Sequence, residues 1–378
     1  MSPASPTFRV AALEPYAAVS HRLFLDGLAA GSRHRIEVHA LPARAWKWRM
    51  RTAALHFAGE LARARGDGPP PDLLLASDYL NLAELRALLP APLRDVPAVL
   101  YFHENQLTYP LQPGEARDHH YALTHLYAML DARASRFNSA WHRESFLAAL
   151  ADLLAHVPDV DTAPALAAAR ERSGVLPLGT DVPAGEPRRP VDGEPPAILW
   201  NHRWEYDKDP DAFVDALVEL RDGGLAFRVR ALGQTFREKP PAFARLAAEL
   251  PDRLDALGHV ADRDAYLEAL RGAHVVVSTA RHEFFGLGTL EAIRGGLFPV
   301  LPRDLAYPEL LPEERRGGGP FLYERAGGLA QPLARALELV ASDALLDERR
   351  ALVRSTDRFA WQRLAPEYDA LFERCASE

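Results

Sequence analysis

Short apolar runs alternate with longer amphipathic stretches along the whole chain. In the first half the runs are FRVAAL (8–13), IEVHAL (36–41), DLLLAS (72–77), AVLYFH (98–103) and SRFNS (135–139). In the second half they are AILWN (197–201), FRVRALG (227–233), HVVVST (274–279) and LFPVLP (297–302). Runs of this length between helical patterns are typical of buried parallel strands with covering helices. The pattern therefore predicts an α/β fold in which two such sheets follow each other along the chain.

A proline-rich segment separates the two halves, and five prolines between 183 and 196 disfavour regular structure there. Because 378 residues exceed what one core usually fills, we expect two domains. The expected parts are an N-terminal domain (1–183), a linker (184–196), a C-terminal domain (197–356) and a C-terminal helix (357–378).

The C-terminal helix is predicted from the spacing of Phe359, Leu364, Tyr368 and Leu371, which form one apolar face. We expect this helix to pack back on the N-terminal domain. Pro366 is expected to kink or split it.

Composition and charge narrow the function classes. The formal net charge of -8 argues against a protein that coats nucleic acid through bulk positive charge, although a local basic patch is compatible with it. The single cysteine, Cys375, excludes an intrachain disulfide and a thiolate metal cage. No window offers about 18 uninterrupted apolar residues and the start lacks a signal pattern, so a cytoplasmic protein is expected, with no membrane as partner.

One segment departs from this acidic balance. Residues 44–51 read RAWKWRMR, with four cations, two tryptophans and no acid. In a strand, Lys47, Arg49 and Arg51 would share one face. In a helix, Arg44, Lys47 and Arg51 would fall on one side. The segment therefore has a basic face in both geometries. The alternative is that the tryptophans belong to the core and that the cations are merely solvated.

Two further patterns point to an anionic ligand in the second half. Arg203 and Lys208 lie in the turn after AILW, at the sheet edge where ligands usually bind, although both could be solvated charges paired with neighbouring acids. Glu283 and Glu291 bracket a turn into a helix that ends at Gly295. The start of that helix offers unpaired N–H groups suited to a diphosphate, and carboxylates accept hydrogen bonds from sugar hydroxyls. Two glutamates at this spacing also arise by chance in many helices.

The cationic turn and, later in the chain, the turn between two glutamates follow each other in the same order as in the donor domain of the retaining glycosyltransferases of family 4, which the second half therefore resembles. These enzymes have the GT-B fold, in which two Rossmann-like domains face each other across a cleft. VLPLGTD (175–181) looks like the family's strand before the linker, and Arg203 with Lys208 matches its Arg-x(4)-Lys diphosphate clamp. Glu283-x(7)-Glu291 is similar to its acceptor-side and ribose-side glutamates.

The resemblance implies roles for these residues. The diphosphate would lie over the clamp, Glu283 would hold the hexose hydroxyls, and Glu291 would bind the ribose. The donor-binding residues implied are Arg203, Lys208, Gly233, His259, Glu283, Phe285, Gly286, Leu287 and Glu291. The acceptor hydroxyl would attack on the leaving-group face and lose its proton to a diphosphate oxygen, so neither a cofactor nor a metal is expected.

A narrower resemblance comes from LPARAWKWRMRTAAL (41–55), LNLAEL (80–85), YFHENQLTYP (101–110) and HEFFG (282–286). These stretches look like the glycosyltransferase-like proteins identified as tRNA-queuosine mannosyltransferases. That group implies GDP-mannose as donor and the queuosine base of a tRNA, tRNA-Asp in particular, as acceptor. One departure is that Ala18 and Val19 stand where the group tends to carry two glycines.

The same resemblance completes the expected site. His103 would contact the transferred sugar or the acceptor hydroxyl, and the catalytic set would be His103, Arg203, Lys208 and Glu283. The acceptor-binding residues expected are Ser20, His21, Trp46, Lys47, Trp48, Arg49, Arg51, Asn105 and Gln106.

Other functions stay open at this point. The same fold could use a lipid, a glycan or a small molecule as acceptor, could act as an epimerase, or could bind tRNA without turnover. His119 and His120 lack an accompanying set of metal ligands, so no metal site is expected. The sequence leaves the oligomeric state open.

Overall fold

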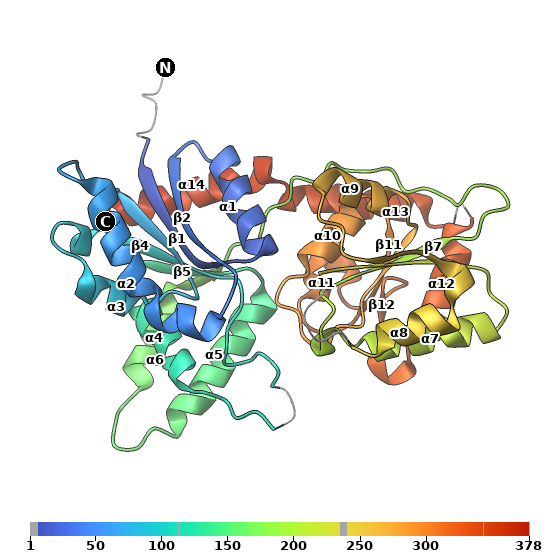
Figure 1. Cartoon of the computed structure of the whole chain (residues 1–378), viewed down its shortest axis with the longest axis horizontal. Helices are drawn as coiled ribbons and strands as arrows, with labels where there is room; N and C mark the ends of the chain where they lie inside the picture. Colours follow the sequence, from blue (N-terminus) through green and yellow to red (C-terminus); the bar gives the residue numbers. More distant parts are fainter. Residues whose placement is uncertain (1–6, 112–113, 235–239, 343, 378) are drawn as a thin grey trace. The chain divides into compact units, whose positions relative to one another are not determined.

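The computed structural model describes residues 7–111, 114–234, 240–342 and 344–377 (Figure 1). The chain forms two units, Met1–Asp181 with Phe359–Glu378, and Val182–Arg358. The chain thus enters the second unit after Asp181 and returns to the first after Arg358.

The first unit is built on a parallel sheet with strand order β2-β1-β3-β4-β5-β6 (Figure 1). The strands are β1 (Arg9–Ala17), β2 (Arg35–Pro42), β3 (Leu73–Ser77), β4 (Ala98–Phe102), β5 (Ala134–Phe137) and β6 (Ser173–Val175). The helices are α1 (Val19–Gly31), α2 (Trp46–Arg65), α3 (Leu82–Leu88), α4 (His120–Asp131), α5 (Ala140–Ala155), α6 (Ala163–Arg172) and the C-terminal α14 (Trp361–Ser377). Every residue of β3 and β4 is buried, as continuous apolar runs require when helices cover both faces of a sheet.

The second unit contains another parallel sheet, with strand order β12-β11-β10-β7-β8-β9. Its strands are β7 (Ala197–Asn201), β8 (Arg228–Leu232), β9 (Leu254–Gly258), β10 (Val275–Val277), β11 (Phe298–Pro302) and β12 (Leu322–Tyr323). Its helices are α7 (Pro210–Asp222), α8 (Ala242–Glu249), α9 (Arg263–Arg271), α10 (Leu287–Arg294), α11 (Tyr307–Leu310), α12 (Ala330–Val340) and α13 (Leu346–Ser355). The predicted α/β class with two sheets is confirmed. Within the described ranges, none of the helices is long and apolar enough to span a membrane.

The strands that the apolar runs do not predict all lie at sheet edges. They are β6 in the first sheet, and β9 and β12 in the second. An edge strand has only one neighbour and needs fewer buried side chains; the residues of β9 alternate between half-buried and exposed. The strand expected at 175–181 is likewise reduced to Val175 in β6 and one isolated bridge between Thr180 and Ala360.

The proline-rich segment forms neither helix nor strand, and it is bonded along the second unit. The Gly185 N–H donates to the Arg294 carbonyl (2.8 Å), and Arg294 Nε donates to the Val182 carbonyl (2.5 Å). Arg349 Nη2 donates to the Arg188 carbonyl (3.1 Å). These bonds fix the segment to the unit it precedes, so it is not a free spacer.

Helix α14 packs against α1 within the first unit. The Trp361 indole lies so close to Gly27 that a Cβ on this glycine would be 1.9 Å from Nε1. Ser32 Oγ donates to Asp369 Oδ1 (2.5 Å). Of the kink or split expected at Pro366, the split does not occur, because the helix continues through this residue. Its buried face holds the helix together where one backbone hydrogen bond is lost.

Replacing Trp361 by alanine is expected to lower the free energy of unfolding by about 3–5 kcal/mol, because the change leaves a cavity where a buried indole was. Urea unfolding followed by circular dichroism measures the loss. Trp48→Ala is the matched control, since that side chain is 71% exposed and its removal is expected to cost less than about 0.5 kcal/mol. Equal losses in the two variants would contradict this packing.

Candidate active site

The turn after β7 holds an almost completely buried lysine. Lys208 ends the short 3-10 helix Tyr206–Lys208, and its side chain is 6% exposed. Its Nζ donates to the His282 carbonyl (2.7 Å) and lies 3.1 Å from Asp207 Oδ2 and 3.4 Å from Glu283 Oε2. Burial by itself would lower the pKa of Lys208, but the two carboxylates raise it above its usual value. The ammonium group therefore keeps its charge inside the protein.

Glu283, in the loop between β10 and α10, is the partner of this lysine. Its Oε1 accepts a hydrogen bond from the Phe285 N–H (3.4 Å). Burial opposes ionisation, but Lys208, followed by His202, lowers the pKa of Glu283 to about 2. Glu283 is thus a permanent acceptor for hydroxyl groups and cannot act as a proton donor near neutral pH.

Arg203 lies on the exposed side of the same cluster. Its side chain is 41% exposed, and its Nη2 lies 3.2 Å from Glu205 Oε2. His202 and His282 complete the surroundings; burial, and then the charge of Lys208, lowers the pKa of each to about 4. The structure thus gathers Arg203, Lys208 and Glu283 as expected, with two neutral imidazoles beside them.

The helix predicted after Glu283 begins at Leu287 and is capped by Gly286. Gly286 has a φ of 87°, which favours glycine, and a Cβ there would make a tight contact of 3.3 Å with the Tyr307 ring. The first N–H groups of α10 therefore lie directly beside Glu283 in the chain. A helix start with adjacent cations is suited to a diphosphate.

Glu291, inside α10, is 3% exposed and is held by α9. Arg263 Nη2 donates to its Oε1 (2.8 Å), and the Tyr266 hydroxyl donates to its Oε2 (2.8 Å). Asn201 Nδ2 in turn donates to that hydroxyl (2.7 Å). A ribose hydroxyl that bound Glu291 would therefore donate to this carboxylate beside the Arg263 guanidinium or in its place.

The two remaining donor-site candidates lie after neighbouring strands. Gly233 follows β8, and a Cβ there would lie 1.7 Å from the His202 carbonyl oxygen, so no side chain fits. His259 is exposed and follows β9 directly. Both lie at the carboxyl edge of the second sheet, as do Arg203 and Lys208.

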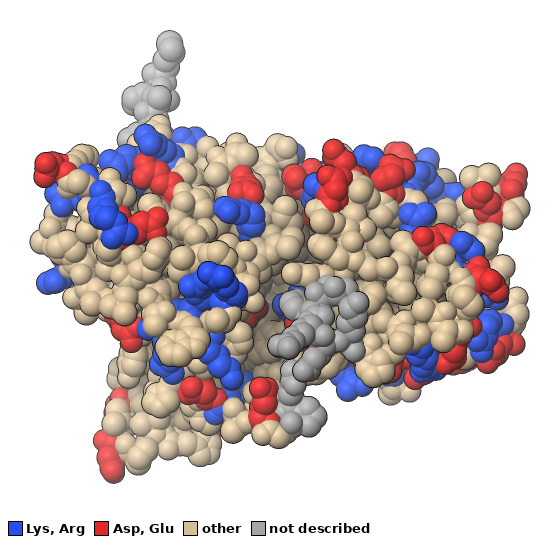
Figure 2. Space-filling view, viewed as in Figure 1, with Lys and Arg blue, Asp and Glu red and all other residues tan. Residues whose placement is uncertain are grey.

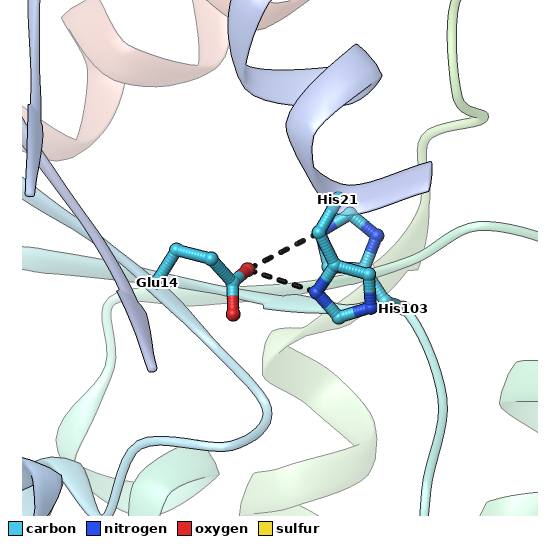
Figure 3. A group of neighbouring side chains, drawn as sticks. All are labelled: Glu14, His21 and His103. Atoms are coloured by element: carbon cyan, nitrogen blue, oxygen red, sulfur yellow. Dashed lines mark hydrogen bonds and ion pairs between the residues drawn. The ribbon is translucent and has the colours of Figure 1, made fainter. Parts of the chain in front are cut away.

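In the first unit, three buried polar residues meet at the carboxyl edge of the sheet (Figure 3). Glu14 comes from β1, His21 from the first turn of α1, and His103 directly follows β4. Glu14 Oε2 lies 3.0 Å from His21 Nδ1 and 4.0 Å from His103 Nε2. The two imidazole rings stack with their centroids 3.9 Å apart. The backbone N–H of His103 also donates to Asp78 Oδ1 (2.9 Å).

Two histidines and a carboxylate could hold a metal ion, and the candidate ligand atoms of these three residues lie within 4.8 Å of one another. The planes of the imidazole rings, however, differ by only 22°. Their in-plane lone pairs therefore run side by side and do not converge on one ion about 2 Å from each nitrogen. The geometry fits an ion pair, and a metal would require the rings to rotate.

The basic segment is helical from Trp46 onward, and Arg44 precedes the helix, so of the two geometries left open by the sequence the helix is correct. Trp46 is half-buried against Tyr121, with ring centroids 5.3 Å apart, whereas Trp48 is exposed. Lys47 and Arg51 are exposed one turn apart. On the visible face of the molecule, groups of basic side chains are separated by acidic and uncharged ones (Figure 2). The basic surface is therefore local, in keeping with the net charge of -8.

The other acceptor-site candidates belong to turns. Asn105 is fully buried, and its Oδ1 accepts from the Thr108 N–H (2.8 Å), so this side chain closes its own turn. Gln106 Nε2 donates to Glu104 Oε1 (2.9 Å), and Ser20 is half-buried in α1.

The backbone explains why alanine fits at the start of α1. Ala18 caps this helix with a φ of -68°, an angle open to any residue. The turn therefore does not need the glycines found in the related group.

Sequence reasoning missed Glu14, Asp78, Arg263 and Tyr266. Glu14 lies near the end of the buried part of β1, and Asp78 directly follows β3. Acidic residues at the carboxyl ends of two predicted strands are a signal that could have identified both. Arg263 and Tyr266 lie on α9, which follows an edge strand that the pattern did not predict.

The chain matches two family models and several known proteins. Residues 9–180 match the family described as tRNA-queuosine alpha-mannosyltransferase N-terminal, and residues 119–358 match Family 4 Glycosyltransferase in conflict systems. The tRNA-queuosine alpha-mannosyltransferase of Drosophila melanogaster is 32% identical over 99% of this chain and 98% of its own. A GDP-mannose-dependent alpha-(1-6)-phosphatidylinositol dimannoside mannosyltransferase of Mycobacterium tuberculosis is 30% identical over 50% of this chain and 49% of its own.

Solved structures show the same fold. A sucrose-phosphate synthase from Thermosynechococcus elongatus has a TM-score of 0.70 and 16% identity, covering 97% of this chain and 99% of its own. The catalytic domain of starch synthase IV from Arabidopsis thaliana has a TM-score of 0.71 and 13% identity, covering 99% and 100%. The GT-B fold expected from the sequence is confirmed.

Lys208→Met is expected to lower the free energy of unfolding by about 3–5 kcal/mol, because it leaves buried carboxylates without their cation. The double variant Lys208→Met with Glu283→Gln is expected to lose less unfolding free energy than the two single variants lose in sum. The difference, the coupling energy, is expected to be on the order of 1–3 kcal/mol. Chemical denaturation of the four proteins measures the cycle. Strictly additive costs would show that the two side chains do not depend on each other.

Proposed function

The chain belongs to the tRNA-queuosine alpha-mannosyltransferase family, and we propose that it transfers mannose from GDP-mannose to the queuosine base in the anticodon of a tRNA. The observation that carries this proposal is the relationship to the Drosophila enzyme over almost the full length of both chains. The charged cluster of Arg203, Lys208 and Glu283 supports turnover, because a protein that merely bound tRNA would not need it.

The donor would lie over the second unit. Arg203, Lys208 and the start of α10 would stabilise the negative charge that grows on the leaving diphosphate. Glu283, ionised at all working pH values, would accept hydrogen bonds from the mannose hydroxyls. The acceptor hydroxyl would attack on the face that the diphosphate leaves and would lose its proton to a diphosphate oxygen, which retains the configuration. Glu291, Gly233 and His259 would surround the nucleoside.

GDP as the nucleotide is part of the proposal. The related proteins are named mannosyltransferases, and the mycobacterial one is named GDP-mannose-dependent. A direct competition between GDP and UDP for the free protein would decide between the nucleotides.

The acceptor would lie over the first unit, whose residues 9–180 match the family's N-terminal domain. His103 would contact the sugar or the acceptor hydroxyl. Lys47, Arg49 and Arg51 would bind tRNA phosphates, and the exposed Trp48 would stack on an unpaired base. Trp46 would support this surface from beneath, through its contact with Tyr121. We propose tRNA-Asp as the tRNA and the cytoplasm as the place of the reaction.

Arg203→Ala is expected to lower mannose transfer to queuosine-containing tRNA by about two to three orders of magnitude, while the fold is retained. The assay uses GDP-mannose, with the same tRNA lacking queuosine as the acceptor control. Arg271→Ala is the matched variant. Arg271 also pairs with one nearby glutamate, but it is the last residue of α9 and does not belong to the cluster of Arg203, Lys208 and Glu283. Near-normal transfer by Arg203→Ala would refute the clamp.

Charge reversal at Lys47 and Arg49 is expected to weaken tRNA binding and to reduce its salt dependence by about 0.7–0.9 in slope for each lost phosphate contact. GDP binding, measured by calorimetry, should stay unchanged. The control is Arg63→Glu with Arg65→Glu, which removes the same charge from the far end of α2. Equal weakening by both pairs would mean that total charge, and not this surface, binds the tRNA.

A further inference from the structure

A half-buried carboxylate, Glu104, lies at the carboxyl edge of the first sheet, two positions after the end of β4. Its Oε1 accepts hydrogen bonds from the Tyr79 hydroxyl (2.5 Å) and from Gln106 Nε2 (2.9 Å). Within the described ranges, no group donates to its Oε2 and neither oxygen is paired with a cation. The two donors thus hold the carboxylate by one oxygen and leave the other for a ligand.

The neighbouring charges do not neutralise Glu104. The nearby cation, His21, is already bound by Glu14, whose Oε2 lies 3.0 Å from His21 Nδ1. Burial raises the pKa of Asp78 well above its usual value, and the charge of Glu104 adds to this rise. Burial, followed by the charge of Glu104, also raises the pKa of Tyr79, so its hydroxyl remains a donor to the carboxylate. Glu104 is therefore a fixed negative charge that has no cation of its own among the described residues.

The surroundings select the kind of ligand that Glu104 can bind. The Tyr79 ring stacks on the half-buried ring of Tyr16, with the centroids 4.9 Å apart and the planes 17° apart. An anionic group would be repelled by Glu104. An alkylammonium group would donate a charge-assisted hydrogen bond to Oε2 and would be attracted to tyrosine rings. The site is thus suited to an organic cation.

The same aromatic residues connect this carboxylate to the basic start of α2. Tyr79 and Tyr121 belong to one buried cluster, and Trp46 packs against it. The guanidinium carbon of Arg51 lies 4.8 Å from the centroid of the Tyr121 ring. One surface of the first unit therefore offers cations for phosphates and, across the aromatic cluster, an anion at Glu104. A ligand that fits both would combine an anionic backbone with a cationic base.

We propose that Glu104 is a specificity-determining residue whose Oε2 accepts a hydrogen bond from the protonated secondary amine of the acceptor base. Queuosine carries this amine between its deazaguanine ring and its cyclopentenediol, and guanine lacks it. Tyr79 and Gln106 are the positioning residues that orient the carboxylate. The inference rests on the proposed function for the identity of the acceptor, but the amine site can be observed by binding alone, without any sugar transfer.

Binding of the full-length protein to three forms of one tRNA tests the site. The modified position carries guanine, 7-aminomethyl-7-deazaguanine, which has an ammonium group but no cyclopentenediol, or queuosine. Both amine-containing tRNAs are expected to bind about tenfold or more tightly than the guanine form, as one hydrogen bond between charged groups can provide. In Glu104→Gln this preference is expected to disappear, while the affinity for the guanine form stays unchanged. Fluorescence anisotropy with labelled tRNA measures the affinities.

Two further variants separate charge at this position from total charge and from folding. Glu171→Gln removes the same charge from an exposed residue that lies just before β6, at the opposite edge of the sheet, and should leave all three affinities unchanged. Glu104→Asp keeps the charge and should restore part of the preference. Equal weakening of all three tRNAs by Glu104→Gln would mean a structural role and would overturn the proposal.

Other outcomes distinguish the amine site from the proposed function. A preference for queuosine that does not extend to the aminomethyl form would assign recognition to the hydroxyls and overturn the role of Glu104. If the preference depends on Glu104 but no mannose is transferred, the proposed function fails and the amine site stands. If mannose is transferred to queuosine and Glu104→Gln keeps the full preference, the amine site fails.

Discussion

The arrangement of the second unit depends on one buried charge, the ammonium group of Lys208. An ammonium group taken from water needs acceptors on every side, so the chain segments around it must deliver them. Asp207 and Glu283 supply carboxylates, and His282 supplies its carbonyl oxygen. The Lys208 carbonyl in turn accepts from Thr279 Oγ1, which itself accepts from the Trp200 indole in the core. The same cation lowers the pKa of Glu283 to about 2, so one contact fixes both the loop before α10 and the charge of the residue expected to hold the sugar.

The first unit also buries a charged group with a partner of opposite charge, but here the group is an anion. There the buried group is the Glu14 carboxylate, and its cation is an imidazole whose pKa is raised. Both charge pairs lie where parallel strands end, because all carboxyl ends of a parallel sheet meet at one edge. The two units thus share a topology but differ in the charge they bury.

The sequence predicts the interior of each sheet better than its edges. The runs that correspond to β1, β3, β4, β7 and β10 are apolar because helices cover both faces of those strands, whereas β9 and β12 have no such requirement. The spacing of Arg203, Lys208 and Glu283 places them correctly in two turns. It could not show that Arg263 and Tyr266 hold Glu291, because that contact joins two helices.

The pattern also cannot decide between helix and strand at residues 44–51, because a basic face is present in both geometries. Only tertiary packing separates Trp46, which lies against Tyr121, from the exposed Trp48. Glu14 directly follows the first apolar run, but its buried neighbours include His103, which lies 89 positions away in a different strand connection.

The most direct test of the whole account is the chemical identity of the product. The protein is incubated with GDP-mannose and a queuosine-containing tRNA, and the tRNA is digested to nucleosides for mass spectrometry, with and without an α-mannosidase. The account predicts that queuosine gains one hexose and that the α-mannosidase removes it. Unchanged queuosine, with mannose gained by a lipid or glycan offered in parallel, would contradict the acceptor, and a hexose released only by a β-mannosidase would contradict retention of configuration.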